Sequence, residues 1–494
     1  MSKFNTNATI PMTVNDEGYA AYVMAPKTKL ITQVLTSFFN ESKFYGDNSE
    51  EIKNTIVQVI KTDAQFVSQL AIFARREFNM RSISHVLVSF LAFYPEGKPY
   101  VKKTIKSIIC RGDDATEILA CYLDLFGKPI PNSLRKALRE VFTTFDDYTL
   151  AKYKGDGKTV KMKDILCLCH PSPANDHQSE SWKKLLEDRL EPAYTWETEL
   201  SAKGNNKETW EELIGSRRLP YMAMLRNLRN ILKANPDNLQ RVLDTIGDPV
   251  AVKNSKQLPF RYLSAYYEVM HLNDIDSKIR DLTLDTLENA MDASISNLPK
   301  IPGKTFVAID VSGSMHSTIS MKSNIRCCEI ALLLGVIARK ICEDAVVYKF
   351  DHTIQPMCIP SRNGILYTVF NENPMGGGTN MDLPFQKMLE HFQDGHGDYD
   401  RIIILSDNEC NYAGLYGWRG DHTVQRMADE FRRESGRNIW VHAVDMMGYG
   451  TQQFAGSHTN IIAGRSEKLF DFILLAEKGI GSLEQRIREY VPAE

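Results

Sequence analysis

The spacing of the hydrophobic residues changes near residue 300, and this change constrains the fold more than any other feature of the sequence. Up to about residue 298, apolar side chains recur every three or four positions, as in QLAIFARREFNM (69–80) and LPYMAMLRNLRNILK (219–233). This spacing is typical of amphipathic helices, and short turns such as YPEGKP (94–99) separate them. The first part therefore predicts a helical bundle or an α-solenoid, although no fixed repeat length is evident.

After NLPKIPGK (297–304), short apolar runs alternate with helical patterns. We expect strands at KTFVAIDV (304–311), AVVYKFD (345–351), RIIILS (401–406) and NIWVHAVD (438–445), with helices between them. Strands that are apolar almost throughout are typical of a parallel sheet covered on both faces. This part therefore predicts a doubly wound α/β fold, which gives an α-helical domain at residues 1–298 and an α/β domain at residues 299–494.

The composition agrees with a soluble, multidomain chain of 494 residues, since 43% are hydrophobic and 24% are charged. The longest apolar run, ALLLGVIA (331–338), is too short for a membrane span, and the first residues show no secretory signal. The nine cysteines are odd in number and scattered, so we expect a reducing, cytoplasmic location without disulfide bonds. A net charge of −3 does not by itself indicate a nucleic-acid-binding protein.

Oxygen-bearing side chains gather where the predicted strands end. Asp310, Ser312 and Ser314 follow the first strand at alternate positions, Asp407 follows RIIILS, and Thr379 lies in a glycine-rich loop. Because ligands bind at the carboxyl ends of parallel strands, these five groups predict an oxygen-only site for a divalent metal, with Mg²⁺ as the expected ion. At least one coordination position would stay open for a carboxylate or phosphate. In the alternative, the serines and Asp407 only cap helices.

This D-x-S-x-S pattern with a distant threonine and a distant aspartate resembles the metal-ion-dependent adhesion site of von Willebrand factor A domains. The resemblance implies that Asp310, Ser312, Ser314, Thr379 and Asp407 bind the metal. It also implies an acidic protein partner at the open position, for which an exoribonuclease is one candidate.

The helical part resembles the TROVE module of the Ro ribonucleoprotein family. The similar stretches are KMKDILCLCHPSP (161–173), RRLPYMAMLRNLRNIL (217–232), LPFRYLSAYY (258–267) and FNMRSISHVLVSFLAFY (78–94). The resemblance implies HEAT-like helical repeats that close into a ring, joined by the A domain. It implies further that single-stranded 3′ ends of misfolded non-coding RNA enter a central hole and that a small, structured Y-like RNA binds outside.

Two residues match family positions associated with Y RNA, namely Lys152 in AKYKG and His170 in DILCLCHP. The family usually has an arginine shortly after this lysine, whereas Asp156 stands in this stretch. The departure weakens the local positive charge, for which Lys154, Lys158, Lys161 and Lys163 are candidates to compensate. Without the resemblance, His170 would be read as a capping or packing residue.

The densest basic cluster is formed by Arg217, Arg218, Arg226 and Arg229, with no acidic residue between positions 213 and 236. It is either a solvated helix face or a set of phosphate contacts lining the ring. Arg75, Arg76 and Arg81 form a second candidate group.

These patterns indicate a non-enzymatic RNA-binding protein, acting in RNA quality control or as a scaffold for RNA degradation. The alternative is a protein-interaction scaffold that uses the helical solenoid and the A domain without RNA. A metal-dependent hydrolase is disfavoured, because no nucleophile, general base or catalytic carboxylate pair is evident. A zinc site at Cys167, Cys169 and His170 is also disfavoured, because no second ligand pair follows.

Overall fold

The described residues fall into two compact units, and each unit is built from segments that are distant in the sequence. The computed structural model describes residues 12–15, 19–36, 49–257, 259–296, 298–319, 323–359, 364–372, 374, 376–411, 424–456, 458–464, 467–479 and 483–492. The described residues of Met1–Ser42 and Leu219–Leu483 form the sheet unit. Those of Lys43–Arg218 and Glu484–Glu494 form the helical unit.

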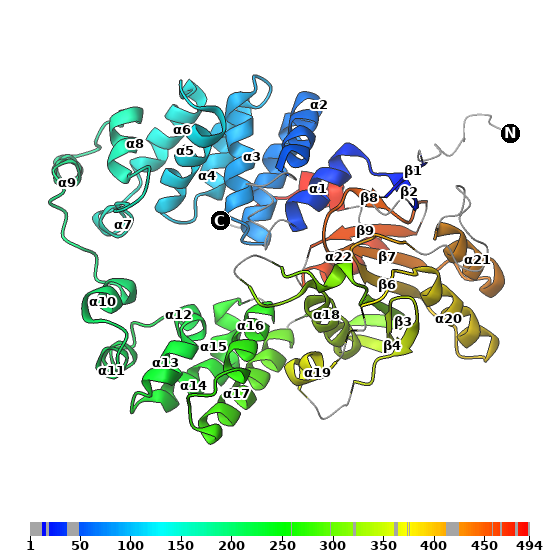
Figure 1. Ribbon diagram of the computed structural model, residues 1–494. Helices are drawn as coiled ribbons and strands as arrows, with labels where there is room; N and C mark the ends of the chain where they lie inside the picture. The colour runs from blue at the N-terminus through cyan, green and yellow to red at the C-terminus, as the bar shows by residue number, and fades with distance from the viewer. Residues whose placement is uncertain are drawn as a thin grey trace. The chain divides into compact units, whose positions relative to one another are not determined.

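The helical unit consists of helices, as the hydrophobic spacing predicts, joined mostly by short turns but by longer connections at 153–161 and 187–195 (Figure 1). Its helices are α2 (Ser49–Glu77), α3 (Ser82–Phe93), η3 (Lys98–Tyr100), α4 (Val101–Ile108), α5 (Asp113–Phe126), α6 (Asn132–Phe142), α7 (Asp147–Lys152), α8 (Met162–Cys169), α9 (Asp176–Leu186), α10 (Trp196–Lys203), α11 (Lys207–Gly215) and, at its end, α23 (Leu483–Arg488).

Helix α3 is buried on all sides from Ile83 to Ala92, whereas α6 buries one face against its neighbours in this unit. In α6 the buried residues are Leu134, Ala137, Leu138, Val141 and Phe142, which recur with helical spacing and leave charged residues outside. Helix α6 packs between α4 and α8, and the Phe142 ring meets the ring of Trp182 in α9 at 5.2 Å.

The sheet unit combines further helices with the α/β fold. Its helices before the sheet are α1 (Pro26–Thr36), α12 (Tyr221–Arg226), α13 (Leu228–Ala234), α14 (Leu239–Gly247), α15 (Pro249–Ser255), α16 (Pro259–Met270) and α17 (Ser277–Ile295). The single helix expected over 219–233 is two helices, because the backbone leaves helical geometry at Asn227. This unit extends on both sides of the predicted boundary at residue 298, although helices give way to strands between Ile295 and Ile301.

The main sheet has the strand order β5-β4-β3-β6-β7-β9, in which only β5 is antiparallel. Its strands are β3 (Ile301–Asp310), β4 (Cys342–Phe350), β5 (Ile354–Pro356), β6 (Arg401–Ser406), β7 (Trp440–Asp445) and β9 (Thr459–Ala463). A second, antiparallel sheet joins β1 (Met12–Val14), β2 (Ala20–Val23) and β8 (Thr451–Gln452). The chain moves from β3 to β4 on one side and returns to β6 on the other, so the sheet has a topological switch point between β3 and β6.

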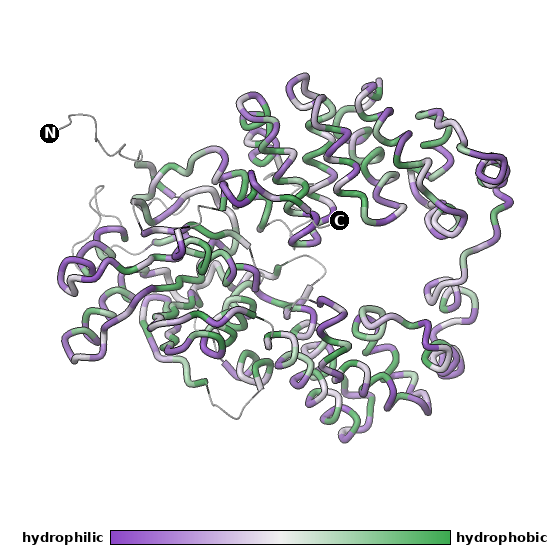
Figure 2. Tube along the Cα trace, turned by 180° about the vertical axis from the view of Figure 1, so that it is seen from behind, coloured by the Kyte–Doolittle hydropathy of each residue, from purple (hydrophilic) through white to green (hydrophobic). Residues whose placement is uncertain are grey.

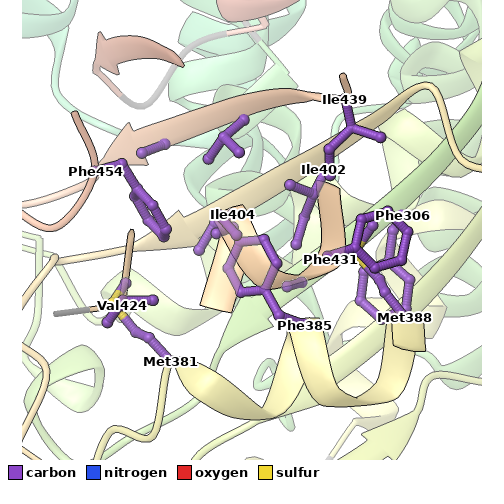
Figure 3. Packing of buried hydrophobic residues seen from close by; sticks show 14 of the residues in the cluster. Phe306, Met381, Phe385, Met388, Ile402, Ile404, Val424, Phe431, Ile439 and Phe454 are labelled. Carbon is purple, nitrogen blue, oxygen red and sulfur yellow. The ribbon is translucent and has the colours of Figure 1, made fainter. Parts of the chain in front are cut away.

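Helices cover both faces of the main sheet. They are α18 (Cys327–Ile341), α20 (Asp382–Gln393), α21 (Gln425–Ser435) and α22 (Leu469–Glu477), while α19 (Ile365–Asn371) packs on α18 and on α17. On one face, Phe306, Ile402 and Ile404 pack against Phe385 of α20 and Phe431 of α21 (Figure 3). The strands are hydrophobic along most of their length, whereas α20 and α21 carry many hydrophilic residues (Figure 2).

The observed α/β order confirms the predicted fold class, and β6 has the bounds expected from RIIILS. None of the described helices combines the length and the apolar composition needed to cross a membrane.

Candidate functional site

Two buried carboxylates lie next to each other at the switch point of the sheet. Asp310 is the last residue of β3, and Asp407 follows the neighbouring strand β6. Both are fully buried. Asp310 Oδ1 accepts the N–H of Ser312 at 2.9 Å, and Asp310 Oδ2 accepts the hydroxyl of Ser406 at 2.6 Å. These bonds fix the orientation of the Asp310 carboxylate.

The electrostatics of this pair favour a cation. Burial, with the charge of Asp407 as the second cause, raises the pKa of Asp310 to about 7. Two carboxylates that repel each other in a buried place are stabilised when a divalent ion supplies the opposite charge. The donor set therefore fits a metal at this edge of the sheet.

The serines lie beside the carboxylates. Ser312 Oγ and Ser314 Oγ are 3.2 Å apart, and Ser314 starts the short turn η4 (Ser314–His316). Neither serine caps the next long helix, α18. Its N-cap residue is Arg326, whose backbone N–H donates to the Glu329 carboxylate. The capping alternative for these serines is therefore not what the structure shows.

The glycine-rich loop brings Thr379 to the same edge. Gly313 N donates to the Gly377 carbonyl at 2.9 Å, and Gly376 N donates to the Val311 carbonyl at 3.1 Å. Thr379 itself is buried. The loop after β3 and the glycine-rich loop are thus joined by backbone hydrogen bonds, and the chain gathers all five predicted ligands at the carboxyl ends of β3 and β6.

The sequence reasoning missed Asp351, which supports this loop. Asp351 is fully buried directly after β4, and its Oδ2 accepts the N–H of Gly377 at 3.1 Å. Its Oδ1 accepts the N–H of Thr353 at 2.7 Å. The signal was present in the sequence, because AVVYKFD ends in an aspartate just as FVAID does.

Within the described part of the chain, no group of three or more His, Cys, Asp or Glu residues is arranged to hold a metal ion. A metal at the sheet edge would therefore depend on the hydroxyls of Ser312, Ser314 and Thr379 as well as on the two aspartates. Metal binding by these five residues remains a prediction.

Lys152 and His170 lie on neighbouring parts of the helical unit. Lys152 ends α7, with its Nζ 5.5 Å from the ring centres of Tyr148 and Tyr153. Burial opposes its charge, but Tyr153 and Tyr148 raise its pKa above the ordinary value. His170 is exposed and caps the end of α8 with a left-handed backbone, at a φ of 48°.

Three of the four lysines expected to compensate for Asp156 have acidic partners. Lys154 pairs with Asp156 itself at 2.7 Å, Lys158 with Glu117 at 2.6 Å and Lys163 with Asp188 at 2.8 Å. These pairs lower the free positive charge around Lys152 and His170, because each carboxylate neutralises one ammonium group.

The four arginines of the basic cluster are exposed, but they divide between the two units. Arg217 and Arg218 follow α11 in the helical unit, and the Arg218 guanidinium lies 4.8 Å from the ring centre of Tyr194. Arg226 and Arg229 belong to the sheet unit, where Arg229 pairs with Glu268 at 3.1 Å.

The second candidate group has a structural role. Arg75 is buried and pairs with Asp114 at 3.2 Å, and Arg81 donates to the same carboxylate at 2.5 Å. Arg76 Nε donates to the Ser107 carbonyl at 2.6 Å. These bonds occupy the guanidinium groups within the helical unit.

Comparison with known families matches both parts of the chain. The profile described as "TROVE domain" matches residues 27–192 and 188–311, which is more than half of the chain. The profile described as "Ro60 vWA domain" matches residues 304–418. This chain belongs to the Ro family.

Relatives of this Ro-family chain include larger proteins. It is 25% identical over 333 residues to telomerase protein component 1 of Rattus norvegicus, covering 49% of this chain and 13% of the relative. It is 24% identical over 226 residues to the RNA-binding protein RO60 of Deinococcus radiodurans, covering 43% of this chain and 40% of the relative. The chain thus spans less than half the length of these relatives.

The crystal structure of the Deinococcus radiodurans RO (RSR) protein has a similar fold. The match has a TM-score of 0.59 at 17% identity and covers 90% of this chain and 99% of that chain. The match shows that the fold is shared, and the two profile matches identify its parts as a TROVE region followed by a von Willebrand factor A-like domain, as predicted.

Proposed function

We propose that this Ro-family chain binds RNA and takes part in RNA quality control without catalysing a reaction. The match of the TROVE profile to more than half of the chain carries the proposal. A related protein of Deinococcus radiodurans is named as RNA-binding. The proposed ligands are a small, structured Y-like RNA and the single-stranded 3′ ends of misfolded non-coding RNA.

Lys152 and His170 are the proposed contacts for the structured RNA. Lys152 offers a point charge to a phosphate, and the exposed His170 ring can donate a hydrogen bond or stack on a base. The partly exposed Tyr148 beside Lys152 adds an aromatic face to this surface.

The four exposed arginines of the basic cluster are the proposed contacts for 3′ ends. Two of them belong to the helical unit and two to the sheet unit. In the helical unit, Arg218 and Tyr194 offer a stacked cation and ring, which suits single-stranded nucleotides. In the sheet unit, Arg226 has no carboxylate partner among the described residues, and Arg229 would exchange its pairing with Glu268 for a phosphate.

The metal site is proposed to serve protein docking. Asp310, Ser312, Ser314, Thr379 and Asp407 would hold a divalent ion, with Mg²⁺ as the expected one. When bound, the ion supplies positive charge and an open position for a carboxylate of a partner, such as an exoribonuclease. Ser406 orients Asp310, and Asp351 holds the glycine-rich loop in place.

A salt titration with two RNA probes tests the proposal. One probe is an RNA hairpin, and the other is the same hairpin with a single-stranded 3′ tail. We expect the affinity of both to fall with salt, with a slope of about 0.7–0.9 per phosphate contact in log–log form. An affinity that does not fall with salt would overturn RNA binding through these cations.

Paired variants separate the two proposed surfaces. Lys152→Ala combined with His170→Ala should weaken binding of the hairpin. The ratio of the affinities with and without the 3′ tail should stay as in the wild type. Arg226→Gln combined with Arg229→Gln should lower the affinity that the 3′ tail adds and should not change binding of the hairpin without a tail. Equal loss of both probes in both variants would contradict separate surfaces.

A protein-interaction scaffold is the second candidate function. The pairing of Lys154, Lys158 and Lys163 with carboxylates favours it, because these pairs lower the positive charge available to RNA. Purified chain that carries no co-purifying RNA and binds neither probe would support the scaffold. Cleavage of either probe in the presence of Mg²⁺ would contradict the non-enzymatic role.

A further inference from the structure

Helix α6 directs two arginines toward the end of α8, where His170 lies. Arg135 and Arg139 are four residues apart and therefore share one face of α6. Arg139 Nε donates to the Cys169 carbonyl at 2.8 Å. Burial raises the pKa of the Cys169 thiol to about 11, and the charges of Arg135 and Arg139 oppose this rise, as expected if both lie near the thiol. His170 follows Cys169 directly and is exposed.

The charge of these two arginines is not compensated. Neither has a carboxylate partner among the described residues. Arg135 Nη2 donates to the amide oxygen of Asn132 at 2.5 Å, while its buried Nε has no hydrogen-bond partner within the described structure. Arg139 uses Nε for the Cys169 carbonyl, and its two Nη groups remain available.

A second face of α6 is different. Glu140, one residue after Arg139, pairs with Lys102 and Lys106 of α4 at 2.5 Å each. Both lysines are thereby matched to one carboxylate, so that face has a structural ion cluster. The contrast shows that the chain supplies acids where α6 packs on α4 but not where α6 faces the end of α8.

Helix capping explains only part of this arrangement. Arg139 stabilises α8, because a cation and a hydrogen-bond donor at a helix carboxyl end satisfy free carbonyl groups. Arg135 makes no bond to the end of α8, and capping leaves the Nη groups of Arg139 unused. The donors that capping leaves unused are able to bind an anionic group from outside the chain.

We infer that Arg135 and Arg139, together with His170, form a binding site for the phosphate backbone of structured RNA. The inference rests on the RNA binding proposed above and adds two residues of α6 to that surface. A guanidinium group presents its donors as a planar fork that matches a phosphate with two hydrogen bonds. His170, which follows Cys169 directly and is exposed, is the proposed third donor.

Hairpin binding by Arg135→Gln combined with Arg139→Gln tests the inference. We expect affinity at low salt to fall roughly tenfold to a hundredfold. The log–log salt slope should fall by about 1.5, because two phosphate contacts are lost. The matched control is Lys136→Gln, which removes an exposed charge from the same helix beside Arg135 and should keep the wild-type slope.

Two further variants separate charge, geometry and folding. Arg135→Lys combined with Arg139→Lys should keep most of the salt slope but lose affinity, since an ammonium group lacks the fork. Arg139→Gln could lower the melting temperature by destabilising α8. In that case the single variant Arg135→Gln tests the inference, because Arg135 makes no hydrogen bond to α8. Its salt slope should fall by about 0.7–0.9.

The possible outcomes distinguish this inference from the proposed function. A wild-type chain that binds the hairpin, with an unchanged slope in Arg135→Gln and in the double variant, would overturn the inference alone. A wild-type chain that does not bind the hairpin would overturn the RNA surface as a whole. Binding of polyglutamate that is lost in Arg135→Gln combined with Arg139→Gln, in a chain that does not bind the hairpin, would assign the site to an acidic protein. This result would also overturn the inference.

Discussion

His442 is a buried residue that links strands β7 and β9 to helix α22 by hydrogen bonds. It is fully buried in β7, its Nε2 lies 2.9 Å from Glu477 Oε1, and its Nδ1 lies 3.2 Å from the Asn460 amide nitrogen. Glu477 of α22 also accepts two hydrogen bonds from Arg401 of β6. Burial lowers the pKa of His442 despite the nearby carboxylate, so the folded chain holds the neutral ring.

We expect stability to fall as the pH drops below about 6.5. In that range the unfolded chain binds a proton at this histidine, whereas the folded chain does not until the pH reaches the lowered pKa. Urea unfolding at about pH 7.5 and about pH 5.5 measures the difference. His442→Gln should be less stable at the higher pH but should lose less on acidification, and an equal loss in both proteins would contradict the assignment.

Asp310→Asn tests the proposed metal ligand without changing its size. In wild-type chain, added Mg²⁺ should raise the melting temperature by mass action, and the variant should lose this rise. In the absence of metal, the variant should be as stable as wild type or more stable, because one of two repelling carboxylates is gone.

Asp394→Asn, an exposed position at the end of α20, is the matched control and should keep the effect of metal. An unchanged metal effect in Asp310→Asn would show that the ion binds elsewhere.

At the scale of elements, one carboxylate joins three helices of the helical unit. Asp114, in the first turn of α5, is fully buried. It bonds Arg75 of α2, Arg81 at the start of α3, and the N–H groups of Cys110 and Arg111. Burial opposes its ionisation, but the neighbouring His85, the arginines and these N–H groups hold its pKa far below the ordinary range.

Asp114→Asn should destabilise the chain by about 3–5 kcal/mol, because it leaves the buried Arg75 without its counter-charge. Urea denaturation at neutral pH measures the loss. Because its pKa is depressed, the stability that this carboxylate contributes is lost progressively as the pH falls below the ordinary value of about 4, so the wild type should keep it in mild acid. Asp124→Asn, on an exposed part of the same helix, should be close to neutral, and similar losses in both variants would refute the assigned role.

At the scale of the whole molecule, the sequence predicts what depends on local pattern. Core strands such as β6 are recognisable because parallel strands buried on both faces are continuous apolar runs. The same pattern locates Asp310 and Asp407, since each directly follows such a run. The short strands β1, β2 and β8 were not predicted, because two to four residues carry too little periodicity and β2 pairs with β8 across more than half of the chain.

Ion pairs between residues distant in the sequence also determine which lysine side chains have a carboxylate partner. Nothing near Lys158 or Lys163 in the sequence indicates Glu117 or Asp188 as partners. Likewise, the expected helix over 219–233 is divided into α12 and α13 because the single residue Asn227 leaves helical geometry. The hydrophobic spacing is the same on both sides of such a short break and does not reveal it.

The last described residues belong to the helical unit, although they follow the sheet unit in the sequence. Arg488 Nη2 pairs with Asp63 of α2 at 2.7 Å, at the position where α2 is kinked. Gln69 donates to the Arg488 carbonyl at 3.1 Å, and the Tyr490 ring meets Phe73 edge to face at 5.2 Å.

A chain shortened after Leu483 should therefore lose protection of α2 while the sheet unit stays folded. Amide hydrogen exchange followed by peptide should show faster exchange in 49–77 and unchanged exchange in β3 and β6. Tyr490→Ala should give the same effect in weaker form, and unchanged exchange in α2 after the truncation would contradict the role of this segment.

During synthesis on the ribosome, residues 43–218 emerge early, but 265 further residues (219–483) are made before residues 484–494. The helical unit is thus incomplete while the sheet unit is being made, and a stop after Leu483 would remove residues that pack on a helix translated long before them.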